Sequence, residues 1–229
     1  YGGDPADAGR HCNTGLIKRF SEHGLTLWGA GAYKGAEGYD ADLPDHSIHT
    51  ENAQGWANLG QQVELTGVVA TAWSRYAVDT VQCNPIDSSL DSLLNVAVIL
   101  HEGKPADGGI DACVEALASV GEKKRFEACR AAMQKLANLR SHGWECVQGT
   151  RQMMVLGRMD ARRTSARNPK LGLHWLRDLE GVVKRADTVA AEVRAAFAGL
   201  IAPIWIEEYL ATRIEPLREE FAALTEGGA

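Results

Sequence analysis

The stretch TGVVATAWSRY, residues 66–76, decides the fold of this chain. Val68, Val69 and Ala70 form a short apolar run that is rich in β-branched residues, which predicts a strand buried on both faces. Large and polar side chains follow where this strand ends. A parallel α/β barrel presents its active site at the carboxyl ends of its strands. The stretch therefore predicts a barrel strand that carries ligand-binding groups at its end.

A second stretch, LTLWGAGAYKG at residues 25–35, repeats this layout earlier in the chain. Helices are expected at about 13–23 and 47–59, so residues 13–76 follow the order helix, strand, helix, strand. This alternation predicts two β/α units with parallel strands. Because two strands cannot bury a parallel sheet by themselves, we expect further strands either before Tyr1 or in another chain.

The periodicity becomes purely helical farther along the chain. A helix is expected from residue 87 or 88 to His101, and KPADGG at 104–109 is the best internal boundary. Beyond it, apolar residues recur at spacings of three and four, most regularly between Leu176 and Leu200. The expected helices cover 111–120, 122–163, 169–200 and 203 onward, with weak points at Gly143, Gly149 and Pro216. The sequence thus predicts an α/β region in 1–103 and an all-α antiparallel helical hairpin or bundle in 110–229.

Composition excludes several classes of function. The chain has 229 residues, enough for one large domain or two small ones, and a formal net charge of -6 without a long basic run, so nucleic acid is not an expected partner. No apolar segment reaches the ~18 residues that a membrane span needs. The five cysteines are spread out without CxxC spacing, which predicts neither a zinc site nor a disulfide framework and favours a reducing, cytoplasmic setting. No cofactor motif such as GxGxxG is present, and we expect no cofactor and no metal.

The chain begins at Tyr1 without a methionine, in the loop-like sequence YGGDPADAG. This start is typical of a piece of a longer reading frame or of a processed product. A localisation signal upstream would then lie outside the sequence.

Candidate ligand-binding residues gather at the ends of the two strands. Trp73 can stack on a sugar ring or can be a core or rim tryptophan, and the two readings have about even weight. Arg75 can bind hydroxyl groups or form a structural ion pair, and Tyr76 follows it. On the earlier strand, Tyr33 can donate a hydrogen bond, Lys34 can orient a carboxylate or stay exposed, and Trp28 suits a core position. His46, His49 and His101 do not cluster with carboxylates at metal-ligand spacing and are treated as ordinary.

Together, WGAGAYKGAEG and TGVVATAWSRY, followed by a loop with a cysteine and a helix that ends in HEG, raise a family resemblance. They resemble the C-terminal part of hexosaminidase D-type enzymes, which belong to glycoside hydrolase family 20. The resemblance covers roughly residues 1–103 and matches the helical remainder much less. It implies a (β/α)8 barrel, of which this chain holds the last two β/α units. The implied activity is removal of terminal N-acetyl-hexosamine from a glycan or glycoside by substrate-assisted, retaining hydrolysis.

In that family an Asp–Glu pair performs the catalysis, and no Asp-Glu dipeptide occurs in this chain. The catalytic pair is therefore expected upstream, and no catalytic residue is assigned here. The resemblance implies instead that the chain supplies the wall of the sugar site, with these residues: Tyr1, Trp28, Tyr33, Lys34, Trp73, Arg75 and Tyr76. Many members of family 20 carry a carboxylate at the position of Arg75, and the resemblance implies that the arginine found here is a feature of the D-type subgroup.

Two hypotheses stay open at this point. The chain is either the C-terminal part of a β-N-acetylhexosaminidase or a non-catalytic helical scaffold or interaction module that carries a degenerate half-barrel. An upstream, in-frame Asp-Glu after an apolar strand supports the enzyme, whereas a start codon just before Tyr1 supports the scaffold. In either case, the exposed edges of the two strands would pair with strands from a second copy of the chain, in a homo-oligomer, or from a missing N-terminal half.

Overall fold

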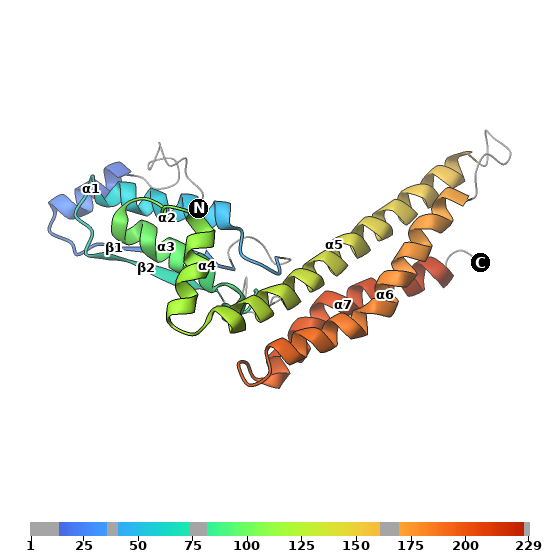
Figure 1. Ribbon diagram of the computed structural model, residues 1–229. Coiled ribbons are helices and arrows are strands. Elements are labelled where there is room, and N and C mark those ends of the chain that lie inside the picture. The colour runs from blue at the N-terminus through green and yellow to red at the C-terminus, as the bar shows by residue number, and fades with distance from the viewer. Residues whose placement is uncertain (1–13, 36–40, 74–81, 161–169, 227–229) are drawn as a thin grey trace. The chain divides into compact units, whose positions relative to one another are not determined.

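The computed structural model describes residues 14–35, 41–73, 82–160 and 170–226. This part of the chain is mostly helical, with a small parallel sheet near its start (Figure 1). The elements are α1 (Thr14–Glu22), β1 (Trp28–Lys34), α2 (His46–Gly60), β2 (Gly67–Ala72), the 3-10 turn η1 (Ile86–Ser88), α3 (Leu90–Glu102), α4 (Gly109–Ser119), α5 (Lys123–Asp160), α6 (Lys170–Ala196) and α7 (Pro203–Glu226). No helix within these ranges combines the length and the apolar character that crossing a membrane requires.

The predicted helix, strand, helix, strand order and the parallel pairing are confirmed. β1 and β2 form a two-stranded parallel sheet in which Trp28 lies opposite Gly67 and Ala30 opposite Val69. A closed barrel is not evident among the described residues, so the barrel stays a prediction. The coarser expectation of a partial α/β fragment is compatible with the structure.

The sheet has an irregularity near its carboxyl end. The register shifts between Ala32 and Lys34, which leaves Tyr33 without a cross-strand partner in the register. Helix side chains form hydrogen bonds with the backbone carbonyl groups at this position. His49 Nδ1 lies 2.8 Å from the Ala32 oxygen, and Ser92 Oγ donates to the Tyr33 oxygen at 2.6 Å. The bulge therefore ties the end of β1 to α2 and to α3.

Helices α2 and α3 cover one face of the sheet (Figure 1). Gly29 and Gly31 lie under the Trp56 indole, because a Cβ added at Gly29 would sit 2.6 Å from Trp56 Cε3. The glycines thus let α2 approach the strand closely. Beside them is a buried cluster of Tyr33, Ala53, Val96 and Ile99. The opposite face of the sheet is apolar and open to solvent, with Trp28 61% and Val69 50% exposed.

The limits of α2 and α3 follow from local chemistry. Asp45 caps α2 by accepting hydrogen bonds from the Ser47 and Ile48 amides at 2.9 and 3.2 Å. α3 begins after η1 rather than at residue 87 or 88, because the chain first makes a 3-10 turn. It ends at Gly103, which adopts φ +76 and donates its amide to Ile99.

The chain divides into two compact units, Tyr1–Arg130 and Ala131–Ala229, each described here by itself. The division falls inside α5 and not at KPADGG. Because α4 packs on α3, it belongs to the first unit. The predicted division into a barrel part at 1–103 and a helical part at 110–229 concerns the family architecture, which these units do not test, and it stays a prediction.

The second unit consists of helices packed along an apolar seam. Five residues of the predicted stripe are buried: Leu179, Ala186, Ala190 and Val193 in α6, and Phe197 directly after it. Ion pairs border this seam. Asp187 of α6 pairs with Arg218 of α7 at 2.7 Å, and Arg194 pairs with Glu207 at 2.6 Å. Residues later in α6 therefore meet residues earlier in α7.

The expected weak points do not interrupt these helices. α5 is continuous through Gly143 and Gly149, and α7 is continuous through Pro216. The two glycines have a packing reason: a Cβ at Gly143 would lie 2.9 Å from Leu217 Cδ1, and one at Gly149 would lie 2.6 Å from Trp175 Cδ2. The absence of a side chain lets the helices approach each other, and this closeness compensates for the low helix propensity of glycine.

We expect Gly149→Ala and Gly181→Ala to change stability in opposite directions. The new methyl group at 149 meets the rigid Trp175 indole, and such overpacking costs roughly 1–3 kcal/mol. A Cβ added at Gly181 would meet no other side chain or backbone of the described residues within 4 Å outside its own helix backbone, so the higher helix propensity of alanine adds about 0.8–1 kcal/mol. Urea unfolding followed by circular dichroism measures both, and a stabilised Gly149→Ala would contradict the packing argument.

Candidate functional site

Lys34 and Trp73 meet at the carboxyl ends of the two strands. The Trp73 amide donates to the Lys34 carbonyl at 3.3 Å, and the Lys34 ammonium donates to the Trp73 carbonyl. The Lys34 side chain bridges the strand ends, and with 2% exposure the residue is not the exposed lysine that its type favours. Its charge therefore lies inside the rim of the sheet, where it fixes the backbone that presents Trp73.

The half-buried Trp73 indole is oriented by a short chain of hydrogen bonds. Its Nε1 donates to Thr71 Oγ1 at 3.2 Å, and that hydroxyl donates to the Gly31 carbonyl at 2.7 Å. A tryptophan held in this way offers a flat apolar surface in a fixed orientation. Among the predicted sugar-binding residues that the structure describes, Trp73 has the position and hydrogen bonding that best suit a sugar contact.

Tyr33 and Trp28 lie elsewhere in the first unit. Tyr33 is 5% exposed and packs in the cluster between the sheet and the helices. Burial, with a smaller contribution from the charge of Asp87, raises the pKa of its phenol. Trp28 is the first residue of β1, so about 20 Å of strand separate it from Lys34. Direct sugar contact remains a prediction for both residues, and their positions favour packing roles.

Three other predicted residues of the sugar site, Tyr1, Arg75 and Tyr76, lie outside the described part of the chain. Their roles stay predictions.

A buried ionic cluster that sequence reasoning missed lies at the amino ends of α2 and α3. Asp91 is 0% exposed, and its carboxylate pairs with Arg130 and with His46 Nε2 at 3.0 Å. Its other oxygen accepts the Ser92 amide at 2.8 Å. Ser92 also donates a hydrogen bond to the Tyr33 carbonyl, so the cluster is connected to the carboxyl end of β1. A buried, fully paired charge is typical of a structural clamp, and only the tertiary structure brings these residues together.

Asn84 is the second residue that the sequence did not single out. It follows β2 in the loop that leads to α3, is 1% exposed, and neither polar atom of its amide has a hydrogen-bond partner among the residues that the structure describes. Buried amides without partners are rare in folded proteins and call for an explanation. Its place beyond the carboxyl end of β2 makes it a candidate to face a ligand or a further chain segment.

The described cysteines do not form disulfides. Cys83, Cys113, Cys129 and Cys146 are all buried thiols. Burial raises the pKa of Cys129 to about 11, with a further contribution from Asp87, so this group stays protonated at neutral pH.

The sequence of the chain is similar to those of two known proteins named hexosaminidase D. It is 24% identical to human hexosaminidase D over 236 residues, which covers 96% of this chain and 48% of the human protein. It is 30% identical to bovine hexosaminidase D over 101 residues, which covers 42% of this chain and 29% of the bovine protein. No family model matches the sequence. The resemblance carried by the two strand motifs is thereby confirmed at the level of the hexosaminidase D-like family.

Two further facts follow from these alignments. The chain spans about half the length of the human relative that it matches. The alignment also covers nearly the whole chain, including the helical unit, whereas the sequence motifs indicated a resemblance over roughly residues 1–103 and a much weaker match in the helical remainder. The similarity therefore extends into the helices after residue 110.

Proposed function

We propose that this chain forms the C-terminal part of a hexosaminidase D-like glycosidase and contributes the last two β/α units of its barrel. The proposal rests chiefly on one observation: two parallel strands, in a chain similar to hexosaminidase D, end at an oriented tryptophan. The proposed substrate is a glycan or glycoside with a terminal N-acetyl-hexosamine, and the proposed setting is the cytoplasm.

The open face of the sheet supports this architecture. Parallel sheets are normally covered on both faces, yet Trp28 and Val69 are largely exposed. Further strands of a barrel would bury them and would pair with the edges of β1 and β2. In the second unit, the pairs Asp187–Arg218 and Arg194–Glu207 support an antiparallel arrangement of α6 and α7 beyond the barrel.

In the proposed enzyme, this chain binds and orients the sugar while catalytic carboxylates act from the upstream part. The acetamido oxygen of the substrate would attack the anomeric carbon, an Asp would orient the amide, and a Glu would protonate the leaving oxygen, giving retention. Trp73 would stack on the C–H groups of the sugar ring. Lys34 would hold Trp73 through a hydrogen bond to its carbonyl, and Thr71 would hold it through a hydrogen bond from its indole. The amide of Asn84 would face the same loop region.

Substitution of Trp73 in the full-length protein tests the proposal. We expect Trp73→Ala to lower kcat/KM for a p-nitrophenyl N-acetyl-hexosaminide about 100-fold, which corresponds to ~2.7 kcal/mol of transition-state stabilisation. Trp73→Phe keeps a flat apolar face and should lose less. The exposed Ile204 offers a control, because Ile204→Ala lies in α7 and should leave the kinetics unchanged.

Stability has to be measured on the same variants. A core tryptophan costs about 3–5 kcal/mol when it is reduced to alanine, and we expect a smaller loss for the half-buried Trp73. A collapsed melting temperature with unchanged kcat/KM would place Trp73 in the core. A full-length protein without any hydrolysis of these substrates would favour the helical scaffold instead.

A further inference from the structure

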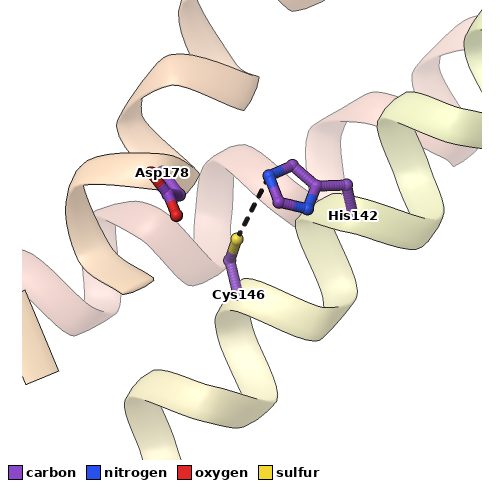
Figure 2. A group of neighbouring side chains, drawn as sticks. All are labelled: His142, Cys146 and Asp178. Atoms are coloured by element: carbon purple, nitrogen blue, oxygen red, sulfur yellow. Dashed lines mark hydrogen bonds between the residues drawn. The ribbon is translucent and has the colours of Figure 1, made fainter. Parts of the chain in front are cut away.

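Three potential metal ligands meet in the second unit. His142 and Cys146 lie on α5, and Asp178 lies on α6 (Figure 2). One donor atom from each of them lies within 4.8 Å of the other two. His142 Nε2 is 3.8 Å from Cys146 Sγ. Figure 2 shows the imidazole and the thiol pointing toward each other, with the carboxylate beside the thiol.

We propose that His142, Cys146 and Asp178 bind a zinc ion. Nitrogen, thiolate sulfur and carboxylate oxygen are the three donor types that zinc takes in proteins. The spacing of four residues puts His142 and Cys146 on one face of α5, one turn apart. In a tetrahedral site with usual zinc–ligand lengths, nitrogen and sulfur lie about 3.5 Å apart. The observed 3.8 Å therefore needs only a small contraction.

Neighbouring side chains orient two of the ligands. Glu145 Oε2 lies 3.7 Å from His142 Nδ1, so a small shift of the exposed Glu145 side chain would let it accept a hydrogen bond from this nitrogen while Nε2 faces the thiol. On α6, His174 Nδ1 lies 3.2 Å from Asp178 Oδ2. Metal-binding histidines and carboxylates commonly have such outer partners. The grouping thus resembles a built site more than a chance contact between helices.

Burial of the three residues suits a site with one open position. Cys146 is fully buried, whereas the side chains of His142 and Asp178 are 43% and 37% exposed. An ion can therefore enter from the solvent side, and three protein ligands leave the fourth tetrahedral position to water. Cys146 would bind as the thiolate and release its proton to solvent. The bound ion would join α5 to α6 and so stabilise the second unit.

Metal titration of the full chain tests the site directly. After removal of metal with a chelator, Co²⁺ is expected to bind one ion per chain and to give a thiolate charge-transfer band together with the visible bands of a tetrahedral ion. Zn²⁺ should displace it and raise the melting temperature. Cys146→Ser should abolish the charge-transfer band, and His142→Gln and Asp178→Asn should each raise the Zn²⁺ dissociation constant at least about 10-fold. Glu145→Gln should raise it about 10-fold through its effect on His142.

Matched controls show whether Zn²⁺ binds at the proposed site or nonspecifically to any thiol or imidazole of the chain. Cys113→Ser removes another buried thiol and His101→Gln an exposed imidazole, and both should bind Zn²⁺ like the parent chain. Circular dichroism of each metal-free variant establishes that it is folded. A missing cobalt spectrum, or Zn²⁺ binding that Cys146→Ser and His142→Gln leave unchanged, would overturn the proposal. Neither result bears on the sugar site, because the residues differ.

Discussion

The 229-residue chain by itself is expected to hydrolyse no N-acetyl-hexosaminide. It lacks the Asp-Glu dipeptide that the resemblance implies, so the proposed proton donor and the proposed group that orients the acetamido oxygen are both missing from it. General acid catalysis alone contributes about 10²–10⁴-fold, and the loss of the oriented internal nucleophile adds to it. The measurement is release of p-nitrophenol by purified chain, compared with a buffer blank and with the full-length protein.

The same chain with Trp73→Ala is the matched control for this experiment. Hydrolysis above the blank that disappears with Trp73→Ala would mean that this chain carries its own catalytic groups, which contradicts the expectation. Equal signals at the blank level from both chains, together with turnover by the full-length protein, agree with it. Circular dichroism of the isolated chain establishes that its helices are formed in the assay.

Removal of the buried Asp91 charge is expected to produce the largest loss of stability in the first unit. Asp91→Asn leaves His46 and Arg130 side by side, with Nε2 and Nη2 3.4 Å apart, and without their carboxylate. Breaking a buried ion pair costs about 3–5 kcal/mol. We expect about 3 kcal/mol, because the Arg130 side chain is 35% exposed and water screens its charge. Urea unfolding measures this loss as a shift of the midpoint.

Two further variants identify the cause of that loss. Asp107→Asn removes an exposed carboxylate that pairs with Lys104, and its effect should stay below about 1 kcal/mol. The double variant Asp91→Asn/Arg130→Met removes the uncompensated cation and should recover a large share of the stability. If the double variant is as unstable as the sum of the two single variants, the loss does not come from an unpaired charge.

Local signals in the sequence sufficed for most of the secondary structure. The alternation before residue 76 predicted two parallel β/α units, and the structure pairs their two strands in parallel. Apolar spacing between Leu176 and Leu200 predicted the buried stripe of α6. Glycine and proline misled the prediction in one respect: Gly143, Gly149 and Pro216 lie within continuous helices. For the two glycines, neighbouring side chains occupy the space that a Cβ would need.

The candidate sites divide along the same line. Trp73 could be singled out from the sequence alone, because it directly follows an apolar run that forms a strand, and both facts are local. The burial of Lys34, the clamp around Asp91 and the His142–Cys146–Asp178 group could not. His142 and Cys146 share a helix face at a readable spacing, but Asp178 joins them only through the packing of α6 on α5. Chain order predicts the elements because their hydrogen bonds and periodicities are short in range, whereas the meeting of distant side chains is decided by which faces bury one another.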